Sequence, residues 1–183
     1  MSDRATYSVD IAGVHRELPL FEVRPGLRIA ILNILGDVEL VAACAKELAA
    51  KLAPYTYDVL VTAESKSIPL AHMLAAETGK AYVILRKSYK PYMGQALQVQ
   101  TLSITTGQPQ NLYMDEKDLR ILEGRKVVIL DDVISTGSTL QGMRLLMQNA
   151  GAHVAAEAAI LTEGERAKWN NIIALGHLPV FSD

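Results

Sequence analysis

The sequence is short of the residues that build several classes of protein. It contains one cysteine, Cys44, in 183 residues, so no disulfide can form within the chain. Two phenylalanines and one tryptophan provide few platforms on which nucleic-acid bases could stack. No hydrophobic run reaches the roughly 18 residues of a membrane-spanning helix. These absences argue against a disulfide scaffold, a membrane protein and a base-stacking surface, and no Cys and His cluster predicts a metal site.

The net charge and the length of the chain exclude further classes of protein. A formal net charge of −2 argues against a basic surface that binds nucleic acid, so no nucleic-acid partner is expected. The first residues lack the apolar core of a signal peptide, and we therefore expect a cytoplasmic protein. Half of the residues are hydrophobic, and the length suits one domain, residues 1–183, with its own core.

The most informative stretch is VVILDDVISTGST, residues 127–139. Four apolar residues predict a buried strand, two acids follow it, and small hydroxyl residues around Gly137 lead into an apolar-periodic segment. Free backbone N–H groups at a helix start, together with Ser and Thr hydroxyls, can hold a phosphate without any Lys. Carboxylates at a strand end can accept hydrogen bonds from sugar hydroxyls and lie near a divalent cation. The stretch therefore predicts a site for a 5-phosphoribosyl group.

An ordinary strand-to-helix turn would explain the hydroxyls but not the adjacent acids. The stretch resembles the motif with which type I phosphoribosyltransferases bind 5-phosphoribosyl diphosphate (PRPP): four hydrophobic residues, two acids and a Thr-Gly-rich loop. The resemblance implies that Asp131 and Asp132 contact the ribose 2- and 3-hydroxyls and hold Mg²⁺ indirectly, through PRPP or water. It also implies that the 5-phosphate is bound by Ser135, Thr136, Gly137, Ser138 and Thr139.

A second loop of small residues, 63–67, follows a predicted buried strand at 57–62 and precedes a predicted helix at 68–78. Ligands of open parallel sheets bind at the carboxyl ends of strands, so both loops are expected to face one crevice. This loop is similar to the pyrophosphate loop of the adenine and xanthine phosphoribosyltransferases. The resemblance implies that Lys66 and the backbone of Ser65 and Ser67 bind the pyrophosphate of PRPP. A solvated Lys in an ordinary loop is the alternative.

Cations follow the third predicted strand, 81–85. Arg86 and Lys87 come directly after it, and Lys90 is close behind. Cations beside a pyrophosphate site offset its charge, and Arg can do so with two hydrogen bonds. The family often carries an Arg-Lys pair here, which implies that all three residues bind PRPP. With Asp131 and Asp132, Lys66 and Arg86 are the residues to which the resemblance gives catalytic roles.

Residues 88–115 are predicted to form a long antiparallel ribbon, with strands at 98–104 and 110–114 around a turn at 105–109. In the family, a flexible lid in this region closes over the reaction centre and keeps water from the cationic sugar intermediate. The adenine enzymes commonly place a Glu in this lid. No acid lies between Ser88 and Met114 here, which weakens the assignment of adenine but leaves the pyrophosphate chemistry in place.

Strands alternate with helices from residue 38 to residue 175, which predicts an α/β protein with a mostly parallel, twisted sheet and helices on both faces. The family resemblance implies that this is the type I phosphoribosyltransferase fold. The resemblance implies that residues 1–36, which begin with a predicted hairpin at 7–20, form a small hood over the base together with parts of the C-terminal segment. Asp37 is a predicted N-cap for a helix at 38–52. A helix is also predicted at 165–175, and a final extended piece at 177–181.

The resemblance implies a purine phosphoribosyltransferase, a homodimer that uses Mg²⁺ and converts a free base and PRPP into a nucleoside 5′-monophosphate and pyrophosphate. Asn33 and Glu163 fall where the xanthine enzymes build part of their base pocket. Those enzymes carry a Lys after the Glu, where this chain has Gly164. Adenine is therefore favoured over xanthine, guanine and hypoxanthine. Two alternatives stay open: a PRPP- or nucleotide-sensing regulator of the same fold, and an inactive relative that handles a pyrimidine or a modified base.

Overall fold

A computed structural model describes residues 4–102 and 109–182 of the chain. Its central sheet has five parallel strands in the order β10-β9-β8-β4-β5. The strands span Val59–Ala63 (β4), Ala81–Leu85 (β5), Lys126–Ile134 (β8), His153–Glu163 (β9) and Ile173–Leu178 (β10). Every residue of β4 is buried, as expected for a strand whose two faces are both covered.

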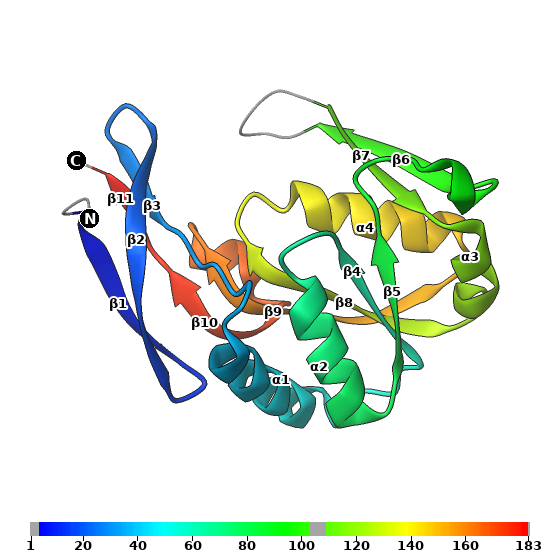
Figure 1. Cartoon of the computed structure of the whole chain (residues 1–183), viewed down its shortest axis with the longest axis horizontal. Helices are drawn as coiled ribbons and strands as arrows, with labels where there is room; N and C mark the ends of the chain where they lie inside the picture. Colours follow the sequence, from blue (N-terminus) through cyan, green and yellow to red (C-terminus); the bar gives the residue numbers. More distant parts are fainter. Residues whose placement is uncertain (1–3, 103–108, 183) are drawn as a thin grey trace.

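Helices cover both faces of this sheet (Figure 1). Helices α1 (Val38–Leu52) and α2 (Ile68–Thr78) lie on one face, and α4 (Ser138–Asn149) lies on the other. Helix α3 (Glu116–Leu122) begins at Asp115, whose side chain accepts a hydrogen bond from the backbone of Lys117. The predicted α/β architecture, with a parallel sheet and helices on both faces, is confirmed.

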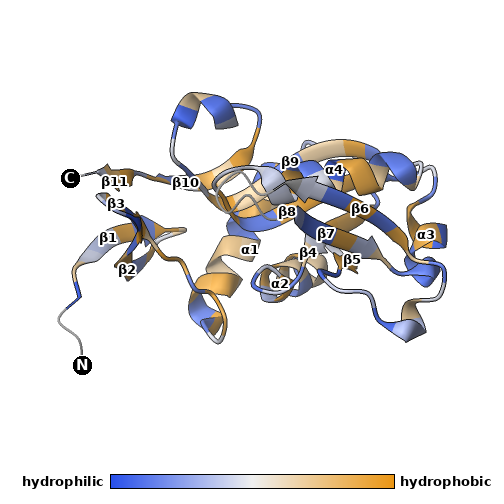
Figure 2. Cartoon of the chain, turned by 90° about the horizontal axis from the view of Figure 1, so that it is seen from above, coloured by the Kyte–Doolittle hydropathy of each residue, from blue (hydrophilic) through white to orange (hydrophobic). Residues whose placement is uncertain are grey.

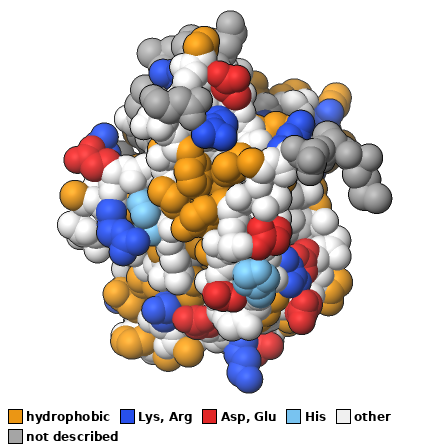
Figure 3. Space-filling model, turned by 90° about the vertical axis from the view of Figure 1, so that its left-hand side faces the viewer, with side chains coloured by type: hydrophobic (Ala, Val, Ile, Leu, Met, Phe, Trp, Pro, Cys, Tyr) orange, Lys and Arg blue, Asp and Glu red, His pale blue; other side chains and the backbone are white. Residues whose placement is uncertain are grey.

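A second, antiparallel sheet lies at one end of the molecule, at the left of Figures 1 and 2. Its order is β1-β2-β3-β11, from strands Thr6–Ile11, Val14–Arg24, Leu27–Ala30 and Val180–Ser182. The turn between β1 and β2 has positive φ at Ala12 and Gly13, as in the tight turns that suit a hairpin. The predicted hairpin is therefore confirmed. Figure 3 shows hydrophobic side chains gathered in the middle of the face at this end of the molecule.

A two-stranded antiparallel ribbon, β6 (Leu97–Leu102) and β7 (Pro109–Met114), packs against α4. The helix meets it at Gly142, where a Cβ would come within 2.9 Å of a Leu112 methyl group. The predicted ribbon is confirmed over these strands, and residues 103–108 of its predicted turn lie outside the described residues. A short 3-10 helix, η1 (Pro91–Met93), leads into the ribbon.

Two hydrophobic clusters stabilise the fold, one on each face of the parallel sheet. Leu60, Val128 and Leu130 point into the cluster under α1 and α2, which also takes residues from the antiparallel sheet. Their neighbours along the strands, Val61 and Ile129, point into the cluster under α4, which also takes residues from the ribbon. The alternation follows from the two-residue period of a strand.

Some predicted boundaries are wrong. Residues 165–175 do not form a helix: a short 3-10 helix, η2 (Arg166–Trp169), is followed by β10. Two consecutive Asn residues break the helical pattern after Trp169, and the β-branched pair Ile172 and Ile173 favours extended structure, which parallel pairing with β9 then stabilises. The final extended piece is correspondingly divided between β10 and β11. Strand β8 also continues through the two acids to Ile134, because its pairing with β9 extends that far.

Among the helices of residues 4–102 and 109–182, none combines the length and the hydrophobicity that crossing a membrane requires.

Candidate active site

The loops after β4 and β8 meet at the carboxyl ends of these two adjacent strands. The Ser67 hydroxyl lies 2.8 Å from Asp131 Oδ1 and 3.2 Å from Asp132 Oδ1, and it accepts a hydrogen bond from the Asp132 N–H at 3.0 Å. Sixty-four residues separate Ser67 from Asp131 along the chain. The side chain of Ser67, for which the sequence indicated only a backbone role, therefore joins the two predicted loops into one site.

The acidic pair is held in an electrostatically unfavourable environment. Burial, together with the charge of Asp132, raises the pKa of Asp131 to about 7, and the hydrogen bond from Ser67 only partly opposes the shift. Such a pair is stabilised by a nearby cation or by hydroxyl donors. Its oxygen atoms suit Mg²⁺, which takes one or two carboxylates and completes its shell with water and substrate phosphates. No cluster of three or more possible metal-ligating side chains occurs among the described residues, so those further oxygens would come from a ligand.

The loop between β8 and α4 has the features of an anion site. Gly137 is the N-cap of α4 and has a φ of 79°, a left-handed conformation that glycine adopts without strain. The first turn of α4 contains no acid, which suits an anion at this positive helix end. The hydroxyl groups of Thr136 and Ser138 lie 3.1 Å apart, and the Ser135 hydroxyl donates to Glu163 Oε2 at 2.6 Å.

Two adjoining cavities, of about 390 and 640 Å³, form a crevice between the parallel and the antiparallel sheet. Both are lined by six shared residues: Ile29, Asp131, Val133, Ser135, Thr139 and Glu163. The smaller cavity also contains residues 64–67 and Lys87, and the larger contains residues 136–138. Most of the residues predicted to bind PRPP therefore line one continuous crevice.

The side chains of two predicted cations, Lys66 and Arg86, have specific partners. Lys66 Nζ lies 3.4 Å from the Leu32 carbonyl oxygen. Arg86 Nε forms an ion pair with Glu64 Oε2 at 2.8 Å, and Glu64 Oε1 accepts the Lys87 N–H at 2.6 Å. Glu64 is a site residue that the sequence did not indicate. Lys66 and Lys87 line the smaller cavity, whereas Arg86 and Lys90 line neither.

The backbone of Arg86 has a further role at the root of the ribbon. Its N–H and C=O groups each form a 2.8 Å hydrogen bond with Tyr113 of β7. The ribbon also contributes Gln110 to the lining of the larger cavity. The segment predicted as a lid is thus attached beside the predicted pyrophosphate site.

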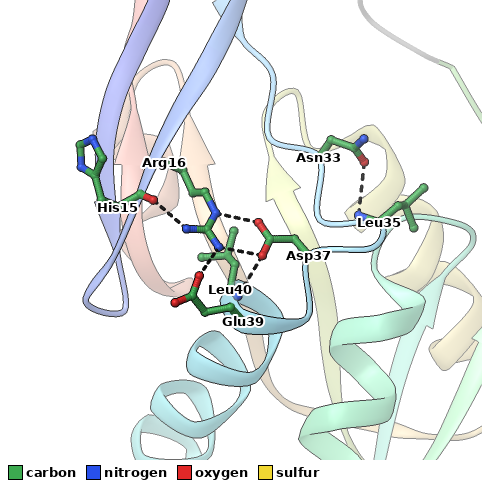
Figure 4. A network of polar contacts seen from close by, with 7 residues as sticks. All are labelled: His15, Arg16, Asn33, Leu35, Asp37, Glu39 and Leu40. Carbon is green, nitrogen blue, oxygen red and sulfur yellow. Dashed lines mark hydrogen bonds and ion pairs between the residues drawn. The ribbon is translucent and has the colours of Figure 1, made fainter.

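The two residues predicted to bind the base have different positions. Glu163 is buried and lines both cavities. Asn33 lines neither: its side-chain oxygen accepts a hydrogen bond from the Leu35 N–H at 3.3 Å, in an exposed turn (Figure 4). The smaller cavity is instead lined by residues 29–32, whose backbone and apolar side chains carry no motif that a sequence could reveal.

A polar cluster fixes the antiparallel sheet to the rest of the chain (Figure 4). The Arg16 guanidinium of β2 forms two hydrogen bonds to Asp37, at 2.7 and 2.8 Å, and a third to Glu39 at 2.8 Å. These bonds hold the pKa of Asp37 below its usual value. Asp37 also accepts the Leu40 N–H at 3.1 Å, which confirms it as the N-cap of α1. Arg16, which the sequence did not indicate, therefore links β2 to the start of α1.

Comparison with known proteins gives one family. A family model described as the phosphoribosyl transferase domain matches residues 30–174. The chain is 29% identical over 143 residues to the purine biosynthesis transcriptional repressor PurR of Bacillus subtilis, covering 78% of this chain and 49% of the repressor. It is 38% identical over 111 residues to a hypoxanthine/guanine phosphoribosyltransferase of a Methanocaldococcus species, covering 61% of this chain and 53% of that enzyme. The chain thus spans about half the length of these curated relatives.

In two further comparisons the aligned region covers most of both proteins. An adenine phosphoribosyltransferase of Sphingopyxis alaskensis is 29% identical over 159 residues, with 84% of this chain and 80% of that enzyme covered. The crystal structure of adenine phosphoribosyltransferase from Thermoanaerobacter pseudethanolicus superposes with a TM-score of 0.73 at 22% identity, over 87% of this chain and 95% of that one. The similarity in three dimensions shows that the fold is that of a type I phosphoribosyltransferase.

Proposed function

The chain belongs to the phosphoribosyltransferase family, and from that premise we propose that it is an enzyme that transfers a phosphoribosyl group from PRPP to a purine base. The products are a nucleoside 5′-monophosphate and pyrophosphate. One observation carries the proposal: the Ser67 hydroxyl joins the loop that resembles a pyrophosphate site to the acidic pair that resembles a ribose site. An ordinary strand-to-helix turn gives no reason for this junction of two polar loops.

PRPP fits the crevice by the charge and hydrogen-bonding capacity of its parts. Asp131 and Asp132 are the acceptors for the ribose hydroxyls, and the hydroxyl and N–H groups of residues 135–139 are the donors for the 5-phosphate. Lys66 and Lys87, with the backbone of residues 65–67, bind the pyrophosphate group. Lys90, which lines neither cavity, adds positive potential from the margin of the crevice, whereas Arg86, which also lines neither, would bind pyrophosphate in exchange for its ion pair with Glu64.

Mg²⁺ is the cofactor that these groups fit. Asp131 and Asp132 would hold it through PRPP oxygens or water, and when bound it neutralises charge on the pyrophosphate group. The protein's own cations act on the same group: Lys66 and Lys87 stabilise the negative charge that grows on pyrophosphate as its bond to ribose C1 breaks.

The bond to the leaving oxygen loosens first, which gives the ribose an oxocarbenium character and leaves the bonding electrons on pyrophosphate. A purine nitrogen then forms the new bond to C1, and the proton of that nitrogen passes to the departing pyrophosphate. Water must be excluded while this cation exists. Two parts of the chain serve this purpose in the proposal. The hood, residues 1–36 with the C-terminal strand β11, covers the base, and residues 88–115 form the lid.

Adenine is the base we propose, with hypoxanthine, guanine and xanthine as the next candidates. The Glu163 carboxylate can accept a hydrogen bond from an exocyclic amino group. Ile29 and Val133 offer an apolar surface to a purine ring. Gly164 supplies no cation for a 2-oxo group. The similarity to adenine phosphoribosyltransferases over most of the chain supports adenine, whereas the similarity to a hypoxanthine/guanine enzyme supports the 6-oxopurines.

A second candidate function follows from the similarity to a purine repressor. In that case the crevice would bind PRPP or a nucleotide as an effector, without transferring the sugar. The slightly acidic chain and the cations Lys66 and Lys87 at the pyrophosphate end favour the enzyme. Binding of PRPP without release of pyrophosphate, together with salt-dependent binding to DNA, would favour the regulator.

We also propose a homodimer, as the family resemblance implies. Exposed hydrophobic side chains at the start of α1, Val38 at 75% and Leu35 at 50% exposure, are candidates for burial between subunits. Light scattering coupled to gel filtration distinguishes a dimer from a monomer of 19.9 kDa.

The experiment that tests the function is pyrophosphate release from PRPP and Mg²⁺ with adenine, hypoxanthine, guanine, xanthine and uracil in turn. The double variant Asp131→Asn, Asp132→Asn is run beside the wild type, and Asp118→Asn serves as a control that removes a buried carboxylate of α3. Release with one purine, lost in the double variant and kept in the control, supports the enzyme and identifies its base. Binding of PRPP without release for any base rejects the transferase for these five bases.

A further inference from the structure

The only tryptophan of the chain, Trp169, contacts two parts of the proposed site: Glu163 and the phosphate-binding loop, residues 135–139. It stands at the end of η2, in the segment where the sequence wrongly predicted a helix. Its indole N–H donates to the Glu163 carbonyl oxygen at 2.9 Å. Its six-membered ring lies against Gly137, the residue that opens α4 at the phosphate-binding loop.

The ring of Trp169 leaves no room for a side chain at Gly137. A Cβ built on Gly137 would lie 2.9 Å from Trp169 Cη2 and 3.4 Å from Cζ3, so the ring occupies the space that any other residue would need. The φ of 79° at Gly137 separately favours glycine. The ring therefore rests directly on the backbone of the phosphate-binding loop.

A second connection joins the same parts. The Ser135 hydroxyl of the loop donates to the side chain of Glu163 at 2.6 Å, while Trp169 holds the backbone of Glu163. Loop residues 135–137 are thus attached to the end of β9 at two points, one through a carboxylate and one through an indole ring. Movement of the loop toward Trp169 is blocked by the ring, and movement away from it breaks the hydrogen bond between Ser135 and Glu163.

We propose that Trp169 is a positioning residue that holds the phosphate-binding loop in the conformation that receives the 5-phosphate. The inference rests on the proposed function and adds a residue to it. Backbone N–H groups bind an anion tightly only when their directions are already fixed, because ordering a loop upon binding costs affinity. Trp169 does not itself contact the substrate in this proposal; it acts through Gly137.

The ring also has a packing role, since Trp169 is partly buried against the cluster under α4. Packing alone predicts lower stability with no preference for any part of the substrate. Positioning predicts a loss of affinity for ligands that carry a 5-phosphoribosyl group, with the affinity for pyrophosphate unchanged. The two roles are therefore separable by ligand.

The first test uses Trp169 as its own reporter. Because no other tryptophan is present, the emission of the wild-type protein reports on this ring alone. Because the proposal has the loop already in its binding conformation, titration with PRPP and Mg²⁺ is expected to leave the wavelength of maximum emission unchanged, as is titration with pyrophosphate and Mg²⁺. Calorimetry on the same samples measures binding independently. A red shift of the emission on PRPP binding, which would show that the ring leaves Gly137 as the loop rearranges, overturns the proposal.

The second test uses variants. Trp169→Ala is expected to weaken PRPP binding and raise the KM for PRPP about tenfold or more, while kcat and pyrophosphate affinity stay within about threefold. Trp169→Phe keeps an aromatic ring against Gly137 and is expected to recover most of the affinity. Tyr55→Ala, a change to an exposed aromatic residue that lines neither cavity, is the matched control.

Each remaining outcome decides the matter. An unchanged KM in Trp169→Ala, or an equal loss of pyrophosphate and PRPP affinity, overturns the positioning role and leaves the proposed function intact. If Trp169→Ala does not fold, the PRPP affinity of Trp169→Phe and the emission of the wild type provide the test. Absence of PRPP binding to the wild type overturns the proposed function, and this inference with it.

Discussion

Replacing Asp131 with Asn is expected to make the ligand-free protein more stable while removing its activity. The folded protein raises the pKa of Asp131 from 3.8 to about 7, so it binds this proton more tightly than the unfolded chain does. The contribution of Asp131 to stability is therefore complete below about pH 4, is lost as the pH rises toward 7, and is constant above that. A displacement of about three pKa units corresponds to about 4 kcal/mol as an upper bound.

The variant Asp131→Asn has no proton to lose, so its advantage over the wild type is expected to grow from pH 5 to pH 8. Urea denaturation followed by circular dichroism, with EDTA and without PRPP, measures the free energy of unfolding of both proteins at each pH. Pyrophosphate release by the same variant is expected to fall about 10²-fold or more, because a neutral amide is a weaker acceptor for the ribose hydroxyls.

Asp118→Asn provides the control for this prediction. Asp118 is also buried, and burial raises its pKa, but it lies in α3 and lines neither cavity of the crevice. Its replacement is expected to keep pyrophosphate release near the wild-type rate. A stability difference between Asp131→Asn and the wild type that is constant or shrinks from pH 5 to pH 8 refutes the electrostatic account of the acidic pair.

Three further predictions follow from the site. Gly137→Ala is expected to destabilise the protein by about 1–3 kcal/mol and to weaken PRPP binding by calorimetry, because its Cβ would meet Trp169 at a positive φ; unchanged affinity contradicts this. Arg16→Lys, which cannot form two parallel bonds to Asp37, is expected to raise the KM for the base more than that for PRPP in steady-state assays, and equal changes contradict a role in placing the hood. EDTA is expected to stop pyrophosphate release and added Mg²⁺ to restore it; persistence in EDTA contradicts the assigned cofactor.

The sequence predicted the parts of the fold that local patterns determine. Asp37 caps α1 because its side chain reaches a backbone group three residues away. The apolar run before Asp131 has the pattern of a strand that is buried on both faces in a parallel sheet. The order of strand, acids, small loop and helix at residues 127–139 likewise lies within one short segment. Such features depend on neighbours in the chain, which a sequence displays directly.

The features that sequence reasoning missed depend on partners far away in the chain. Arg16 lies 21 residues from Asp37, and the Glu64 carboxylate meets the backbone of Lys87 across 23 residues. Residues 173–178 form a strand because they pair with β9, although their neighbourhood suggested a helix. Asn33 matched a family position, but its side chain bonds locally to Leu35 and stays outside the crevice. Only the assembled fold selects among such contacts.

The two hydrophobic clusters on opposite faces of the sheet have a consequence for how this protein can change. The first contains Ala30 and Leu32, which line the smaller cavity, and the second contains Leu112 of the ribbon. The sheet separates a repacking substitution in one cluster from the other cluster. Changes in the packing beneath the ribbon are therefore expected to leave the lining of the smaller cavity as it is, so that the two parts of the molecule can change one at a time.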